Sequence, residues 1–251
     1  GVLVLHRMKD GGKERAWAAE PRTDYLEFGK KGGLLRWGPR AGEMWDPLTG
    51  NMLWRLQEPN MIGVRAAFLP SGDQLLLYTS RSQFQLISAK DGVKVRDLGG
   101  RKSSYEWMMA VRPDGRAAVS WNENKVVECV SLETGALLFT LPGKRALPYF
   151  GFSGDGKMLF TASQRPQGGQ SIEAWNALTG ELLRSMIGGQ GTISGLSAHP
   201  LSGEILVNGA STRVWDGTGP SASWSYVSVD SANVAFWGPE DLAFMKSGSP
   251  S

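Results

Sequence analysis

Cysteine and histidine are scarce in this sequence, and their scarcity excludes several kinds of chemistry. The 251 residues include one cysteine, Cys129, and two histidines, His6 and His199. A single cysteine cannot form an intrachain disulfide, which favours a reducing compartment such as the cytoplasm. These three side chains, far apart in the sequence, cannot build a typical zinc site by themselves. We therefore expect neither a metal nor another cofactor.

Long apolar runs are also missing. No stretch approaches the roughly 18 apolar residues that a membrane-spanning helix needs, so we expect no membrane insertion. The opening stretch GVLVLHRMKDGG has too short an apolar part for a signal peptide. The chain starts with Gly rather than Met, so we expect it to be processed, excised from a larger protein or complex, or incomplete.

Glycine, proline and tryptophan are plentiful, with 33, 13 and 10 residues respectively. Many tight turns and many large flat side chains favour a β architecture. The formal net charge is +3, which alone is weak support for a nucleic-acid partner.

Two short patterns recur about every 40 residues, which is the length of one four-stranded propeller blade. The first is the turn LTG at Leu178–Gly180 and Leu48–Gly50, with weaker copies at Glu133–Gly135, Lys90–Gly92, Asp216–Gly219 and Lys9–Gly12. The second is a Gly-containing turn followed by an apolar strand, at Pro70–Ser80, Arg112–Ser120, Ser153–Ser163 and His199–Val207. A fixed repeat of this kind predicts the fold before any single residue does.

Each repeat predicts four antiparallel strands: a short apolar strand, a turn, an apolar strand buried on both faces, a third strand, the LTG-type turn and a fourth strand. We expect five complete units, at about 24–57, 64–98, 107–141, 148–187 and 193–229. Residues 1–19 supply a third and fourth strand, and residues 232–251 a first and second strand. The sequence therefore predicts one all-β domain over residues 1–251, a six-bladed β-propeller whose N- and C-terminal strands share one blade. Specifically, we expect Val2–Leu5 and Arg15–Ala18 to pair in one sheet with Val234–Trp237 and Leu242–Met245.

The stretches WDPLTG at 45–50, WNALTG at 175–180 and VWDG at 214–217, with PDG-type turns, resemble the WD40-repeat propellers, particularly the degenerate bacterial type. The resemblance covers nearly the whole chain, although no unit carries the Gly-His dipeptide of the family. The repeat predicts that Trp45, Trp175 and Trp215 hold equivalent third-strand positions and are largely buried between blades. The resemblance implies a non-catalytic scaffold for protein interactions. The stretch Asp46–Trp54 also resembles quinoprotein propellers, and the turns resemble the TolB-type propeller.

Residues that resemble catalytic groups are better explained by the repeat. Asp114 and Asp155 recur in the turn of each unit, so we interpret them as turn residues. Ser153 lacks the second glycine and the following helix of a nucleophile elbow. His6 falls where other units have Trp45 and Trp175, which favours packing, and His199 falls in a turn. We therefore expect a protein that is not an enzyme.

The loops after second and fourth strands share one face of a propeller, here called the top face, and the other loops share the bottom face. The top loops are rich in Arg and Lys, whereas the bottom loops lean acidic, as turn chemistry favours. The candidate partner-binding residues of the top face are Arg40, Arg81, Arg101, Lys102, Tyr105, Tyr149 and Arg165. Arg and Tyr are common in interaction hot spots, although a merely solvated loop face would look similar.

Three functions remain open from the sequence. The first is an interaction scaffold that binds a protein or peptide, acidic in character, through the top face. The second is an accessory binding or gating propeller attached to an enzyme or a transport machine. The third is nucleic-acid binding through the basic face, which would depend steeply on salt concentration.

Overall fold

The computed structural model describes residues 2–6, 12–18, 25–38, 41–57, 65–78, 83–100, 109–122, 126–142, 146–164, 170–187, 193, 195–199, 204–208, 212–215, 222–226, 233–237 and 241–245. Across these residues the structure is all β, as the sequence predicts. The first ten strands are β1 (Val2–His6), β2 (Lys13–Ala18), β3 (Tyr25–Phe28), β4 (Leu34–Trp37), β5 (Gly42–Asp46), β6 (Asn51–Leu56), β7 (Arg65–Phe68), β8 (Gln74–Tyr78), β9 (Gln83–Ser88) and β10 (Lys94–Gly100). The next eight are β11 (Met109–Val111), β12 (Ala117–Trp121), β13 (Val127–Ser131), β14 (Leu137–Thr140), β15 (Ala146–Phe152), β16 (Met158–Gln164), β17 (Gln170–Asn176) and β18 (Leu182–Ile187). The last are β19 (Gly195–Ala198), β20 (Ile205–Asn208), β21 (Thr212–Trp215), β22 (Ala222–Tyr226), β23 (Asn233–Trp237) and β24 (Asp241–Met245).

The strands of the described residues form five four-stranded antiparallel sheets and two hairpins. The sheets are β3–β6, β7–β10, β11–β14, β15–β18 and β19–β22, each with its strands in chain order. The hairpins are β1–β2 and β23–β24. Each of the five predicted complete units therefore corresponds to one sheet, with the predicted number and order of strands.

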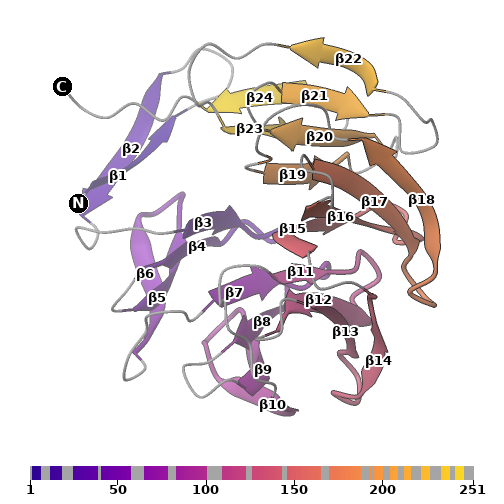
Figure 1. The fold of residues 1–251 in the computed structure, drawn as a ribbon. Coiled ribbons are helices and arrows are strands. Elements are labelled where there is room, and N and C mark those ends of the chain that lie inside the picture. Colours follow the sequence, from indigo (N-terminus) through magenta and orange to yellow (C-terminus); the bar gives the residue numbers. More distant parts are fainter. Residues whose placement is uncertain are drawn as a thin grey trace.

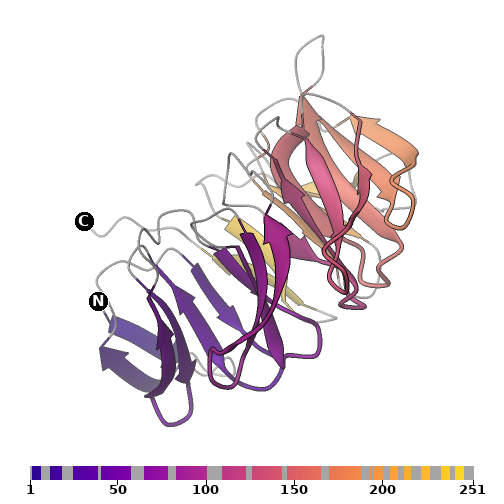
Figure 2. The ribbon, with the colours of Figure 1, turned by 90° about the horizontal axis from the view of Figure 1, so that it is seen from below.

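The sheets follow one another around an arc, with their first strands innermost and their fourth strands outermost (Figure 1). Along the inside of the arc, β7 contacts β11, β11 contacts β15, β15 contacts β19 and β19 contacts β23. Seen from below, the sheets are stacked from the indigo end of the chain to the orange end (Figure 2). Successive sheets therefore meet face to face.

The second strand of each four-stranded sheet is the most buried. All described residues of β4, β12 and β20 are buried, and so are Leu75 to Tyr78 of β8. The fourth strands β6 and β14 are mostly exposed. Because successive strand residues point to opposite faces, a second strand that is buried throughout fits only between two neighbouring sheets.

Alternate residues of one strand serve two different cores. In β8, Leu75 and Leu77 join a cluster that includes Leu35 and Met44 of the preceding sheet. Leu76 and Tyr78 join a cluster that includes Ala118 and other residues of the following sheet.

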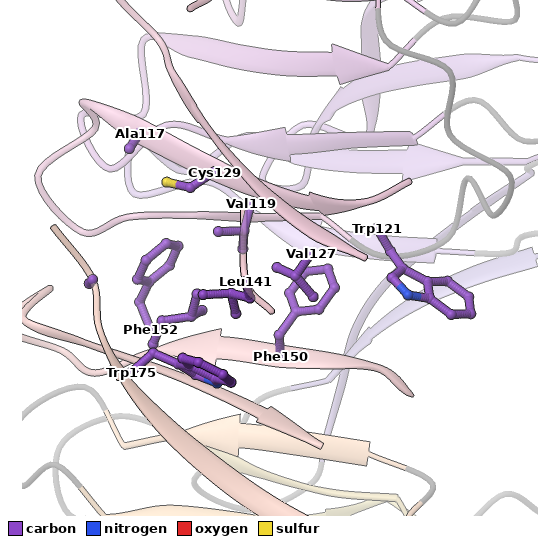
Figure 3. Close-up of a cluster of buried hydrophobic side chains, with 11 residues drawn as sticks. Ala117, Val119, Trp121, Val127, Cys129, Leu141, Phe150, Phe152 and Trp175 are labelled. Carbon is purple, nitrogen blue, oxygen red and sulfur yellow. The ribbon is translucent and has the colours of Figure 1, made fainter. Parts of the chain in front are cut away.

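The same arrangement occurs farther along the chain. Val119 and Cys129 meet Phe152 and Trp175 between β11–β14 and β15–β18 (Figure 3). Another cluster joins Phe160 and Ile172 to Ile205 of the next sheet. The hydrophobic core is thus a series of layers between sheets.

The repeated turns have the geometry that their residues predict. Gly50, Gly92, Gly135 and Gly180 occupy the same place in the turn before the fourth strand, with φ between +72° and +74°. A side chain other than glycine is strained at such φ values, which explains why the glycine recurs in every copy. The residue that begins each of these turns, Asp46, Ser88, Ser131 or Asn176, accepts backbone N–H bonds two or three residues ahead.

The three tryptophans occupy equivalent positions, as predicted. Each follows a register shift in the third strand, and Trp45, Trp175 and Trp215 pair with Met52, Leu182 and Ala222 respectively. Trp175 is 3% exposed, and its indole N–H donates a 2.9 Å bond to Thr161 Oγ1. Trp45 is only half-buried, because it faces the two-stranded hairpin β1–β2, where its ring lies 6.1 Å from that of Trp17. The side chain of Trp215 lies outside the described residues.

The shared terminal blade is not formed, and this prediction was wrong. Each end does form a hairpin, but β1–β2 and β23–β24 are separate two-stranded sheets. Each hairpin satisfies part of its backbone hydrogen bonding within itself, whereas joining them requires a ladder between opposite ends of the chain. The hairpin β1–β2 is mostly exposed and lacks the doubly buried second strand that anchors the other sheets. It is attached to β3–β6 by the Trp17–Trp45 contact and a bond from Arg15 to the carbonyl of Thr49.

Replacing Trp175 with alanine should cost about 3–5 kcal/mol of unfolding free energy, since it removes a buried aromatic ring from a layer between two sheets. Trp45→Ala is the matched comparison and should cost less, because Trp45 is half-buried. Urea unfolding of both variants measures the two losses. A Trp175→Ala protein with the stability of the parent would show that this layer does not hold the sheets together.

Candidate functional site

Most of the candidate residues on the top face lie outside the described residues. This applies to Arg40, Arg81, Arg101, Lys102, Tyr105 and Arg165. Tyr149 is described: it lies in β15, is half-buried, and packs against the cluster formed by Phe160, Ile193 and their neighbours. Its ring therefore contributes to the contact between two sheets, and only part of its surface is open to a partner.

The bottom turns are described, and their carboxylates are used by the turns themselves. Asp114 Oδ1 accepts bonds from Arg112 Nε and Arg116 N, each at 2.9 Å. Asp155 Oδ1 accepts bonds from Ser153 Oγ at 2.7 Å and Lys157 N at 3.0 Å. The prediction that both are turn residues is confirmed.

These bonds favour the ionised carboxylates. The bond from the Arg112 guanidinium is the main cause that lowers the pKa of Asp114, and the bond from the Ser153 hydroxyl does the same for Asp155. Likewise, the Thr49 hydroxyl lowers the pKa of Asp46. A general acid at neutral pH needs a raised pKa, so these groups are poised as hydrogen-bond acceptors in turns.

A recurring polar position on the third strand was missed by the sequence reasoning. Two residues before the tryptophan position, which is the residue after the register shift, four sheets carry Glu43, Gln85, Glu128 and Glu173. Glu128 accepts a 2.7 Å bond from Asn122, and Glu173 a 3.0 Å bond from Ser163. Burial raises the pKa of Glu173. The sequence could have revealed this position, because it always stands two residues before the tryptophan position.

The strongest member of this series is an ion pair inside the first sheet. Arg36 is completely buried, and its Nη1 lies 2.9 Å from Glu43 Oε2. The same oxygen accepts a 3.0 Å bond from the indole of Trp45, and Arg55 lies 3.8 Å from the other oxygen. Because Arg36 and Glu43 face each other across β4 and β5, strand register places them together. Removing one partner of such a pair would leave an uncompensated buried charge, which is strongly destabilising.

A hollow of about 330 Å³ opens between the sheets β3–β6 and β7–β10, at their turn ends. Its walls come from both sheets and include Gly29, Gly33, Met44 and Phe68. Sequence reasoning missed it, although a signal exists in the turn after the first strand. Where the second and third sheets have Leu69 and Arg112, the first sheet has Gly29.

The backbones of the two histidines lie at the repeat positions that the sequence predicts. His199 is buried in a turn where its backbone N–H bonds the carbonyl of Glu204, which confirms the predicted turn position. His6 follows a register shift and pairs with Lys13, which is the position held by Trp45 in its sheet. Across the described residues, three or more His, Cys, Asp or Glu side chains nowhere gather as a metal site would require. The described residues also include no helix long and apolar enough to cross a membrane.

These features define the class: an all-β repeat protein built from stacked four-stranded antiparallel sheets. Comparison with protein-family models gives no match, and comparison with curated proteins gives none either.

The thiol of Cys129 should be unreactive in the folded protein. It is completely buried between β11–β14 and β15–β18, and burial raises its pKa to about 11. Since the thiolate is the reactive species, DTNB at pH 8 should label no thiol in the native protein and one thiol per chain after denaturation. Rapid stoichiometric labelling of the native protein would contradict this packing.

Proposed function

We propose that this protein is a WD40-like β-propeller that acts as a non-catalytic interaction scaffold. The observation that carries the proposal is the chain of contacts between first strands, from β7 through β11, β15 and β19 to β23. With the first strands innermost and the sheets stacked face to face, the connecting loops are gathered at the two ends of the strands. Loops gathered in this way offer broad surfaces for a partner, as in other repeat architectures.

The two end hairpins fit this proposal as two halves of a sixth blade that are not hydrogen-bonded to each other. The hairpin β1–β2 has the register shift of a third and fourth strand at His6. The hairpin β23–β24 contacts the preceding sheet through β19 and β20, as a first and second strand would. The proposal therefore assigns six positions around the arc, five to the complete sheets and one to these two hairpins.

We assign partner binding to the top face, and the partner to an acidic peptide segment of another protein. The carboxylates of the bottom turns accept hydrogen bonds from their own turns, which explains why they are there. Turn formation does not require the Arg and Lys residues of the top loops. Arg40, Arg81 and Arg165 follow the second strands of three sheets, so they belong to corresponding loops. A guanidinium matches a carboxylate with two parallel hydrogen bonds, which an ammonium group cannot do. Each exposed ion pair contributes only about 0–1 kcal/mol, so an apolar anchor must add to them.

The experiment replaces Arg40, Arg81 and Arg165 together with serine and measures recovery of partner proteins from an extract of the native host. The matched control replaces three bases of the bottom turns, Lys30, Arg116 and Lys157, which are exposed. Both triple variants should keep the parent's melting temperature, because these loop charges do not hold the sheets together. The top variant should lose most of the recovered partner, at least about ten-fold for three such pairs, and the bottom variant should recover it in full.

Two results would overturn the assignment. Equal recovery by the parent and the top variant would exclude the top face as the partner surface. Binding of nucleic acid with a steep loss between low and moderate salt would replace the peptide partner with a nucleic acid. Binding that changes little with salt would fit a peptide with an apolar anchor.

A further inference from the structure

The hollow between β3–β6 and β7–β10 lies beside a repeat position that lacks a side chain, Gly29. Gly29, Leu69 and Arg112 each follow a first strand, and each donates its N–H to a carbonyl at the start of the second strand: that of Gly33, Gln74 or Ala117 respectively. Leu69 packs into the layer between the second and third sheets. Arg112 fills the corresponding space in the next layer and reaches the carbonyl of Ala177 at 3.4 Å. Gly29 contributes no side chain to its layer, and the ring of Phe68 packs directly against its backbone.

The shape of the hollow depends on two glycines. A Cβ on Gly29 would lie 2.7 Å from the ring of Phe68, and one on Gly33 would lie 2.9 Å from the sulfur of Met44. Phe68 and Met44 therefore pack directly against the backbone. With Leu53 and Ala89 they give the hollow an apolar floor and walls.

The rim of the hollow is charged, and its charge is unevenly distributed. Lys31 and Asp73 form an ion pair with each other, across the two sheets. Lys90 also lines the hollow, and within the described residues its ammonium group has neither an ion-pair nor a hydrogen-bond partner. The neighbouring Asp91 is used by its own turn, where the Ser88 hydroxyl and the Val93 N–H lower its pKa. Lys90 is thus a cation at the rim that has no ion pair among the described residues, although its charge also helps to lower the pKa of Asp91.

We propose that this hollow binds an aromatic carboxylic acid, with the ring on the apolar floor and the carboxylate at Lys90. Its volume is at the lower end of the range for ligand pockets and suits one aromatic ring rather than a nucleotide. A ligand ring would make a favourable aromatic contact with Phe68 and a favourable sulfur–aromatic contact with Met44. The acid is either a free small molecule or the C-terminal aromatic residue of a peptide. This site lies at the bottom turns, so it is independent of the partner surface proposed for the top face.

The test uses N-acetyl-L-phenylalanine and its C-terminal amide, which share the ring and differ in the carboxylate. Backbone amide shifts of Gly29, Gly33 and Gly72 in the intact chain report on binding. The acid should shift these signals with a dissociation constant on the order of 0.1–1 mM, and the amide should bind at least about five-fold more weakly. A peptide ending in Phe that binds at least about five-fold more tightly than the acid would identify a peptide C-terminus as the source. Equal or weaker peptide binding would identify the free acid.

Three variants distinguish the contribution of the ligand's ring to binding from that of its carboxylate. Ala89→Leu introduces the residue that the third sheet has at this position, Leu132, and should abolish binding by filling the hollow. Lys90→Gln should weaken the acid to the level of the amide and leave the amide unchanged, whereas the exposed control Lys157→Gln should change neither. If Ala89→Leu unfolds the protein, Leu53→Ser on the exposed strand β6 takes its place and should weaken both ligands. The proposal is overturned if acid and amide bind equally, or if neither shifts the three glycine signals at 10 mM, roughly ten times the weakest expected dissociation constant.

Discussion

The burial of each second strand between two neighbouring sheets is the constraint on which the rest of the structure depends. Leu75 and Leu77 belong to one layer of the core, and Leu76 and Tyr78 of the same strand belong to the next. A single sheet has two apolar faces and therefore cannot be stable alone in water. Each sheet needs a neighbour on either side, and this need orders the sheets around the arc.

The sequence predicts the local structure well, because local rules govern it. Glycine at positive φ and Asp, Asn or Ser at the turn start produce the same turns at every copy, so the five sheets and their strand order follow from the repeat. The repeat also predicts the equivalent positions of the three tryptophans, but it does not predict that Trp45 is only half-buried. That burial depends on the neighbouring sheet, which at the start of the chain has only two strands.

Features that depend on contacts between repeats cannot be predicted from the sequence of one repeat alone. Pairing between the two end hairpins was predicted from counting strands, but a strand count does not specify a ladder between opposite ends of the chain. The Arg36–Glu43 pair could be predicted only from the register of β4 and β5. The position of the hollow could be predicted only by comparing Gly29 with Leu69 and Arg112 at the equivalent turn position of the next two sheets. Six of the seven candidate residues on the top face lie outside the described residues, so that surface remains a proposal, and Tyr149 has a packing role that its sequence position did not indicate.

The central claim, that each sheet is stable only through its neighbours, can be tested at Leu76. This side chain is completely buried and packs on Ala118 and Val130 of the following sheet. Leu76→Ala should raise the rate of amide hydrogen exchange in β8 and, to a similar extent, in β12 and β13 of that sheet, with Val95→Ala on the exposed strand β10 as the control. Faster exchange confined to β7–β10, with β12 and β13 unchanged, would contradict the claim and show that the sheets are stable independently.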